Sequence, residues 1–338
     1  MKSSAQNRIR SISYAKYGYF FILPFFIVYF IFQLYPLFNT FRLSLYGNGN
    51  NTGAWVGLEN FEILLFGEGN IAVRAQHQAI IKAFGNTLIL WFGNFIPQIC
   101  LSLLLAVWFT DLNLKIKGKT FFKVVMYLPN IVTAASVAAL FLMLFSRTEY
   151  GPINSLLMGT FGFDEPVNFI RDKWISRGVV MFIQTWMWFG NTMIMLMAAI
   201  MGISPSLFEA ADIDGANSRQ VFTKVTLPLL RPMVVYTMIT SMIGGLQMWD
   251  IPYLYKEGTN FNEDIKTIAV YIYNHFHSLN PNYGYSAAAS VLLFFVTSIL
   301  GSFCFAMNRD KDAAKRKKQI REAKKRMKQQ NKATFGGF

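Results

Sequence analysis

Polar residues that interrupt long apolar stretches are the first candidates for chemistry in this sequence. They are amides and one carboxylic acid: Asn94, Gln98, Gln184, Asn191, Gln247 and Asp250. Such groups pair with hydroxyls, and the apolar ring faces of hydroxyl-rich ligands such as sugars stack on aromatic rings, here Trp186, Trp188 or Trp249. Polar groups at membrane depth are functional candidates, yet amides also hold membrane helices together. Both interpretations stay open for each residue, and Asp250 could also lie at the water interface.

Other chemistries find weaker support. Gly118-Lys119-Thr120 resembles the end of a phosphate-binding loop, but position 113 is asparagine where the first glycine is required, and no strand is predicted before it. His275 and His277 form an isolated pair without a nearby cysteine or carboxylate, so loop or interface roles are favoured over metal binding. No nucleophile–base pairing stands out, and we predict neither an enzyme nor a metal site.

Composition indicates an integral membrane protein. Of the 338 residues 53% are hydrophobic and only 15% are charged, against about 25% charged residues in soluble domains. The two cysteines, Cys100 and Cys304, lie in apolar stretches and indicate no disulfide framework. The first apolar stretch, 17–38, is as long as a full span and lacks a small-residue cleavage site, so a retained helix is expected rather than a signal peptide.

The hydropathy pattern predicts six membrane-spanning helices, at 17–38, 86–110, 124–145, 178–202, 233–249 and 285–307. Six spans place both termini on one side. That side carries 23 Lys and Arg residues and the other carries 9. Without the C-terminal tail the counts are 11 and 9, and the orientation is then set by the short basic segments, which weigh most: the N-terminal cluster and the loop that contains Lys115 and Lys123. The positive-inside rule therefore predicts cytoplasmic termini. Residues 39–85 are expected to form a mostly extracytoplasmic loop.

The segment 204–228 is long and fairly polar, and it lies between two apolar spans on the cytoplasmic side. Ser204 and Pro205 predict a helix start, in which the serine hydroxyl oxygen accepts a hydrogen bond from a backbone N–H of the first turn that has no partner within the helix. Gly215 supplies the backbone freedom for a turn. A second short helix is predicted to begin near Asn217 and to end before Leu227-Pro228. The segment must lie flat on the cytoplasmic face, where a soluble protein can hold it.

This segment closely resembles the EAA loop of ABC-transporter permease subunits. The matching residues are Glu209, Ala210, Ala211, Asp214, Gly215, Ala216, Phe222, Leu227 and Pro228. In that family the loop is a coupling helix that docks on a separate ATPase. The alternative is an ordinary amphipathic surface loop of another membrane protein.

Other stretches resemble the carbohydrate branch of these permeases. They include Asn86-Thr87-Leu88, Leu128-Pro129-Asn130, the segment 150–157 with Tyr150, Gly151 and Asn154, and Asp250-Ile251-Pro252. Where the family often has TGGGP, residues 255–259 read YKEGT, which weakens any detailed substrate analogy.

The resemblance implies an all-α integral membrane protein with six transmembrane helices, a MetI-like permease core at 82–307 and a cytoplasmic coupling helix. The other parts would be the N-terminal tail and first span (1–40), an extracytoplasmic loop (41–81) and a basic cytoplasmic tail (308–338). Implied partners are a cytoplasmic ATPase dimer, a second permease that we expect to be an unlike subunit, and an extracytoplasmic solute-binding protein. The chain itself would carry no cofactor, and ATP-Mg would bind to the ATPase.

The expected function is that of a permease subunit importing sugars or oligosaccharides across a bacterial cell membrane, without catalysis. The alternatives are a permease for another solute, such as glycerol phosphate, and a membrane receptor or enzyme without an ATPase partner. The tail from Lys311 to Lys332 could bind nucleic acid by its charge. Its position after a cytoplasmic span end favours the anionic inner leaflet instead, so no nucleic-acid partner is expected.

Overall fold

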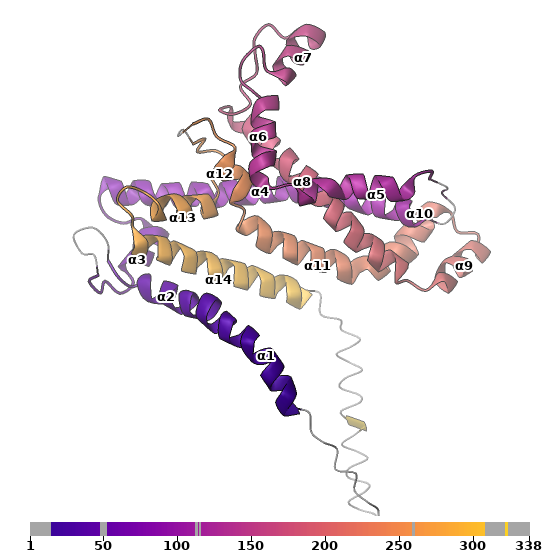
Figure 1. Cartoon of the computed structure of the whole chain (residues 1–338), viewed down its shortest axis with the longest axis horizontal. Coiled ribbons are helices and arrows are strands. Elements are labelled where there is room, and N and C mark those ends of the chain that lie inside the picture. Colours follow the sequence, from indigo (N-terminus) through magenta and orange to yellow (C-terminus); the bar gives the residue numbers. More distant parts are fainter. Residues whose placement is uncertain are drawn as a thin grey trace, which may run out of the picture.

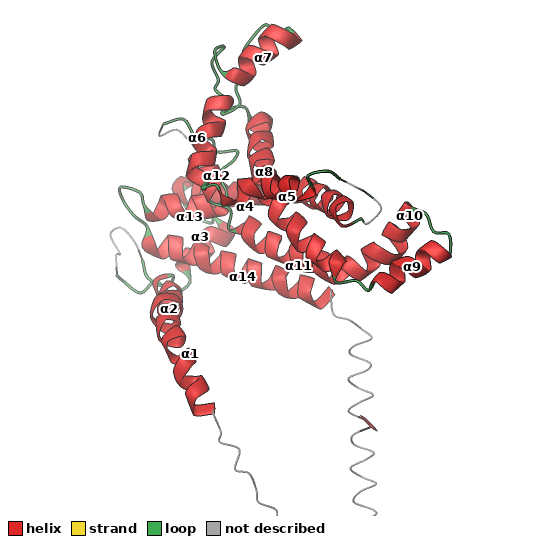
Figure 2. Cartoon of the chain, turned by 45° about the vertical axis from the view of Figure 1, so that its right-hand side comes forward, coloured by secondary structure: helices red, strands yellow, loops and turns green. Residues whose placement is uncertain are grey.

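The structure is a computed structural model that describes residues 15–47, 53–111, 114, 116–258, 261–307 and 322–323. Within these ranges the regular elements are helices, and one isolated antiparallel bridge joins Tyr46 and Trp55 (Figure 2). Five of the described helices are long and apolar enough to cross a membrane, or six if one bent pair forms a single span. The predicted all-helical membrane fold is confirmed. Predictions for the basic tail lie outside the described residues, apart from 322–323.

The first span is a continuous helix with a wide turn in its middle. It consists of α1 (Ala15–Tyr29), the π-turn η1 (Phe30–Leu34) and α2 (Tyr35–Leu43). The turn precedes Pro36, which lacks an N–H and whose ring would clash with the carbonyl four residues earlier in a regular α-helix. None of the apolar window of this span is buried within the chain. In Figure 1, α2 lies beside α14 (Tyr283–Met307) and α1 leaves the body, so lipid or another protein must cover it.

The second span is longer than predicted. Helix α4 runs from Ile71 to Thr110, so it begins well before the expected start at Asn86. Asn70 caps it by accepting a hydrogen bond from the Val73 N–H at 3.0 Å. A shorter helix, α3 (Glu59–Phe66), precedes it. The region expected to be a loop, 39–85, therefore contains α3 and the first turns of α4, which pack with α13 (Ile268–Phe276) and the start of α14.

Helices α4 and α8 (Lys173–Met201) form the central pair of the fold. Polar groups tie them together along their length: Ser102 Oγ donates to the Phe189 carbonyl at 2.7 Å, and Thr185 Oγ1 donates to the Asn94 carbonyl at 3.1 Å. Apolar side chains such as Leu105 and Met193 fill the space between these contacts. Helices α3, α5 (Lys119–Tyr127), α11 (Leu227–Leu246), α12 (Asp250–Leu254) and α13 each pack against one member of this pair or both.

The third predicted span, 124–145, is not one straight helix. Helix α5 (Lys119–Tyr127) leads through a 3₁₀ turn (Leu128–Ile131) to α6 (Ala134–Leu144), with a bend of 96°. Pro129 lies within that turn, and Thr133 caps α6 by accepting from the Ser136 N–H. A new capped helix start after a proline redirects the chain, which hydropathy does not reveal. Helix α7 (Pro152–Phe161) follows α6 and projects from the body (Figure 1).

The last third of the chain joins two ends of the molecule. The EAA-like segment contains α9 (Pro205–Ile213) and α10 (Ser218–Val221), and both lie at the opposite end of the molecule from α3 and α13 (Figures 1 and 2). From α10 the chain continues through the π-turn η4 (Phe222–Thr226) into α11 (Leu227–Leu246) and then into the short α12 (Asp250–Leu254). A buried arginine, Arg177, holds the loop after α12 by donating to the Asp264 carbonyl at 2.9 Å.

Candidate functional site

The first part of the EAA-like segment (residues 204–228) has the predicted structure: a helix, a turn and the start of a second helix. Helix α9 begins at Pro205 and ends at Ile213. The N–H of Gly215 donates to the Asp212 carbonyl and the N–H of Ala216 donates to the Ala211 carbonyl, which is the Schellman pattern of a helix end. Gly215 has φ +69°, a left-handed conformation that favours glycine. The predicted turn at Gly215 is confirmed.

Two details of this segment differ from expectation. The Ser204 side chain makes no capping bond to the backbone and instead pairs with Ser206 Oγ at 2.8 Å. The second helix does not end before Leu227-Pro228, because α10 continues through η4 into α11. The reason is the wide turn: the Leu227 N–H bonds to the Phe222 carbonyl, five residues back. The chain thereby accommodates Pro228, which has no N–H, without ending the helix.

The outer surface of α9 combines an acidic and an apolar side chain. Glu209 is exposed, and Ile213, one turn later, is 87% exposed. Ala210, Asp214 and Gly215 are exposed as well, whereas Ala211 is buried. Leu207, on the same helix, is 44% exposed as well, so α9 presents two large apolar side chains to its surroundings. Leu227 and Pro228 are also exposed, but they belong to the start of α11.

All seven residues predicted for a polar path line one cavity of about 400 Å³. They are Asn94, Gln98, Gln184, Trp188, Asn191, Gln247 and Asp250. Helix α4 contributes the first two and α8 the next three, while Gln247 and Asp250 lie on either side of the short connection from α11 to α12. Residues far apart in the sequence thus meet at one place, because α4, α8 and α11 pack around it.

The cavity contains both interhelical and unpaired amides. The Gln98 amide donates to Thr192 Oγ1 at 2.8 Å and therefore ties α4 to α8. Asn94 and Gln184 are 5% and 7% exposed, and neither side chain makes a hydrogen bond within the described part of the chain. Because buried amides are normally paired, two unpaired amides facing one cavity indicate room for a polar ligand or water.

Several cavity residues were missed by the sequence analysis. Tyr236, Thr237, Thr240, Ser241 and Gly244 line the cavity from α11 at helical spacing. That polar stripe was the available signal, but hydroxyl side chains are common in membrane helices. Of the other two tryptophans named as possible stacking partners, Trp249 lines the cavity and Trp186 does not. The Trp186 ring packs edge-on against Phe141, with centroids 5.6 Å apart.

The cavity has little formal charge. Among the described residues that line it, Asp250 is charged and none is Lys or Arg. Trp91, Trp188, Tyr236 and Trp249 supply aromatic surface. Such a lining, aromatic with a few hydrogen-bonding groups, suits a small neutral polar ligand.

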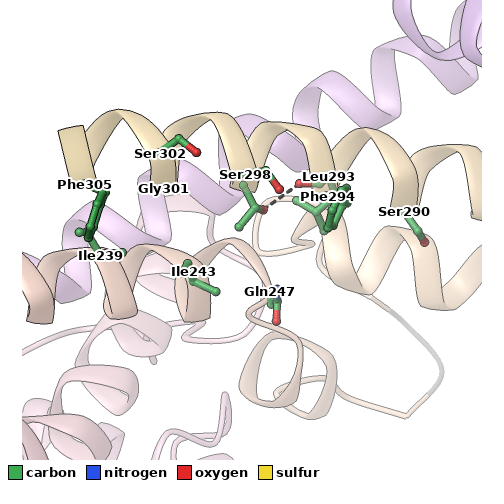
Figure 3. A pocket seen from close by; sticks show the side chains of 11 residues that line it. Ile239, Ile243, Gln247, Ser290, Leu293, Phe294, Ser298, Gly301, Ser302 and Phe305 are labelled. Carbon is green, nitrogen blue, oxygen red and sulfur yellow. Dashed lines mark hydrogen bonds between the residues drawn. The ribbon is translucent and has the colours of Figure 1, made fainter. Parts of the chain in front are cut away.

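A second hollow, of about 750 Å³, lies between α11 and α14. Figure 3 shows Ile239 and Ile243 on one helix facing Ser298 and Gly301 on the other. Gln247 lies at its end and lines the polar cavity as well. The groove is mostly apolar and open along one side.

His275 and His277 lie at the other end of the molecule and bind to the backbone of their own helix. His275 Nδ1 is 2.9 Å from the Tyr271 carbonyl and His277 Nδ1 is 3.1 Å from the Tyr273 carbonyl. In the described part of the chain no three His, Cys, Asp or Glu side chains are grouped as a metal site would require.

Comparison with known proteins identifies the family. Residues 98–309 match the model of the binding-protein-dependent transport system inner membrane component. The chain belongs to this family. The permease is similar to the lactose transport system permease protein LacF of Rhizobium radiobacter, with 30% identity over 296 residues, 87% of this chain and 94% of the relative. The arabinooligosaccharides permease protein AraP of Bacillus subtilis is 28% identical over 301 residues, 88% of this chain and 91% of the relative.

Solved structures agree with this fold. A bacterial alginate ABC transporter, in complex with its alginate pentasaccharide-bound periplasmic protein, contains a chain that is 25% identical, with a TM-score of 0.74 over 87% of the permease and 94% of that chain. The permease is thus a multi-pass inner membrane component of a binding-protein-dependent transport system. Its family consists of transport subunits rather than enzymes.

Proposed function

We propose that the permease belongs to an ATP-driven importer of sugars or oligosaccharides, and that the polar cavity is part of the solute pathway. The observation that carries this proposal is the cavity lining, in which the unpaired amides of Asn94 and Gln184 and the ring of Trp188 face one space. Amides pair with sugar hydroxyls and indole rings stack on sugar faces. Relatives named for lactose and arabinooligosaccharide transport favour the same solute class.

The charge of the cavity favours sugars over the alternative, a phosphate ester such as glycerol phosphate. An anionic ester needs a cationic partner, and none of the described lining residues is Lys or Arg. A receptor without an ATPase would leave the exposed Glu209 and Ile213 surface of the EAA-like segment without a role.

The partners in this proposal are those of an importer. A second, unlike permease would complete the pathway, an extracytoplasmic solute-binding protein would deliver the sugar, and a cytoplasmic ATPase dimer would bind ATP-Mg and contact the EAA-like segment. Both termini would then be cytoplasmic. ATP-driven closure of the ATPases would move the EAA-like segments and open the cavity alternately to either side.

Uptake by proteoliposomes that contain the complete complex tests the solute pathway. A hydrogen bond contributes about 0.5–1.5 kcal/mol, so Gln184→Ala is expected to reduce sugar uptake about 2- to 10-fold. Gln78→Ala is the matched control, because Gln78 is an exposed residue of α4 outside the cavity. Equal uptake by the two variants would remove Gln184 from the pathway, and no uptake of any sugar by the native complex would refute the proposed function.

Two substitutions test the coupling role of the EAA-like segment. Glu209→Lys reverses the charge of the exposed α9 surface, and Gly215→Pro is incompatible with φ +69° and removes the N–H that bonds to Asp212. Both are expected to separate ATP hydrolysis from uptake while the spans stay folded. Glu165→Lys, an exposed acid outside the segment, is the control. Normal uptake by both segment variants would refute the coupling role.

A further inference from the structure

A third hollow, of about 470 Å³, lies next to the polar cavity at the end of the molecule opposite the EAA-like segment. Four rings from α13 and the α11–α12 connection line it, and we name them the aromatic shelf: Trp249, Tyr273, Phe276 and His277. Its remaining described lining consists of Gln247, Ala269, Ile272, Ser290 and Leu293. Neither the proposed pathway nor the EAA-like segment accounts for it.

The rings of the shelf form a continuous series. The centroids of Trp249 and Tyr273 are 5.0 Å apart, Tyr273 stacks on His277 at 4.0 Å, and His277 lies 4.9 Å from Phe276. Tyr253 stacks on Trp249 at 4.9 Å, which fixes the indole in place. Phe276 is nevertheless 45% exposed. A fixed row of rings that is partly open offers a surface for flat apolar faces.

The shelf adjoins the polar cavity. Gln247 and Trp249 line both hollows, so the two hollows meet at these residues. The indole Nε1 of Trp249 is buried at this junction and has no hydrogen-bond partner. An indole N–H is a donor only, and an unpaired buried donor is uncommon in a folded protein. A ligand hydroxyl would satisfy it once a small reorientation of the indole brings the N–H to the surface of the hollow.

The chemistry of the shelf selects the class of ligand. Among the described residues that line it, none is Asp, Glu, Lys or Arg, and the volume is within the usual range of small-molecule sites. Lys256 lies over the rings of Tyr253 and Phe261 rather than over the shelf. A neutral sugar combines an apolar ring face for stacking with hydroxyls for Trp249 and Gln247.

We propose that the aromatic shelf is a second carbohydrate subsite, at the outer mouth of the cavity, where a neutral sugar ring stacks before it enters the pathway. This inference rests on the proposed function, because the shelf faces outward only if the EAA-like segment is cytoplasmic. Trp249 is then the specificity-determining residue at the junction: it donates its N–H to a sugar hydroxyl as the ring passes from the shelf to the amides of the cavity.

The test uses the complete complex in proteoliposomes with a panel of neutral di- and trisaccharides, lactose and arabinotriose among them. Trp249→Phe keeps a ring and removes the donor, and Phe276→Leu removes a ring that is partly exposed and so tests the shelf even if the first variant folds poorly. Tyr150→Leu is the control, because Tyr150 is 85% exposed and lies outside the shelf. Sugar binding to the complex without the solute-binding protein, sugar uptake, and the half-saturating concentration of that protein are measured.

Both shelf variants are expected to weaken sugar binding and uptake about 2- to 10-fold, as expected for the loss of one hydrogen bond or stacking contact. The half-saturating concentration of the solute-binding protein should stay unchanged. If the variants raise that concentration and leave sugar binding intact, the shelf holds a protein and the inference is wrong. If they match Tyr150→Leu while Gln184→Ala still impairs uptake, only the shelf is refuted. If the native complex imports no sugar of the panel, the proposed function fails first.

Discussion

Replacing Gly190 by alanine tests how tightly the bent third span crosses the central helix pair. Gly190 lies in α8, and a Cβ there would be 2.0 Å from the Met126 carbonyl oxygen and 2.9 Å from the Tyr127 Cα. That 2.0 Å separation would have to grow by about 1.4 Å to reach the 3.4 Å of ordinary contact. Because the neighbouring atoms are backbone, no side-chain rotation relieves the clash, and α5 itself must move.

The size of the effect follows from two opposing terms. Overpacking a filled interior costs about 1–3 kcal/mol, and a backbone clash belongs at the upper end. Alanine regains about 1 kcal/mol of helix propensity over glycine. Gly178→Ala, in the same helix, gains only the second term, because nothing lies within 4 Å of its Cβ position. The free energies of unfolding of the two variants should therefore differ by about 3 kcal/mol, or roughly 100-fold in the unfolding equilibrium.

The assay is denaturant unfolding of the purified permease in mixed micelles, followed by tryptophan fluorescence. Uptake is measured in parallel, because Trp188 and Asn191 flank Gly190 and line the cavity. Gly190→Ala should unfold at lower denaturant than the native chain and should lose uptake, whereas Gly178→Ala should match or exceed the native chain in both. The reasoning is wrong if Gly190→Ala proves as stable as Gly178→Ala.

Three further predictions concern Asn154, Arg177 and His275. Asn154→Ala should lower the free energy of unfolding by about 3 kcal/mol, because this fully buried amide donates to the carbonyls of Ser146, Thr148 and Val167. Limited proteolysis should then cut within residues 146–172. Ser155→Ala, at an exposed neighbour, should leave the proteolysis pattern unchanged. Arg177→Gln should lower the free energy of unfolding by about 1.5–3 kcal/mol, because the Arg177 guanidinium donates to Asn86 Oδ1 at 2.6 Å and to the Asp264 carbonyl. The control is Arg74→Gln, at an exposed arginine, and equal destabilisation by the two variants would contradict the prediction. Burial lowers the pKa of His275 below its ordinary 6.5; the hydrogen bond to the Tyr271 carbonyl opposes this shift, and Lys266 adds a smaller contribution to it. The unfolded chain therefore binds more protons, so stability should be complete above pH 6.5 and should fall as the pH drops below it. His275→Gln should flatten this dependence in a denaturation series from about pH 5 to 8.

Hydropathy was sufficient to predict the class of the fold, because apolar length directly reflects the thickness of a bilayer. It could not predict where α4 begins. The residues from Ile71 to Ala83 are mixed in polarity, and they are helical because Ile80 and Ala83 pack against Tyr271 and α14. That contact joins residues far apart in the chain, and no local pattern reports it. The break in the third span was missed for a related reason. Pro129 signals a local disturbance, but the direction of the new helix depends on how α5 and the 3₁₀ turn pack against α8.

The polar residues of the cavity were predictable as a group, because amides within apolar spans are costly unless they face one another or water. Their individual roles were not predictable. Gln98 and Gln184 look equivalent in the sequence, yet Thr192 pairs with the first while the second faces the cavity alone. Asn154, in a stretch that resembles carbohydrate permeases, is likewise a buried structural residue: its amide closes the turn between α6 and α7 and lines none of the three hollows described above.

The continuous helix from α10 through α11 gives the two candidate sites a direct mechanical connection. Ser218 to Leu254 form one apolar helical stretch, so the end that carries Arg219 beside the Gly215 turn and the end that carries Thr240 on the cavity wall belong to the same element. The sequence suggested a separate second helix ending before Leu227-Pro228, which would have required a flexible link between them. Because the wide turn η4 accommodates Pro228 without ending the helix, we expect a displacement of α10 to move the polar stripe of α11 relative to the α4–α8 pair. That relative movement is what alternating access at this cavity would require.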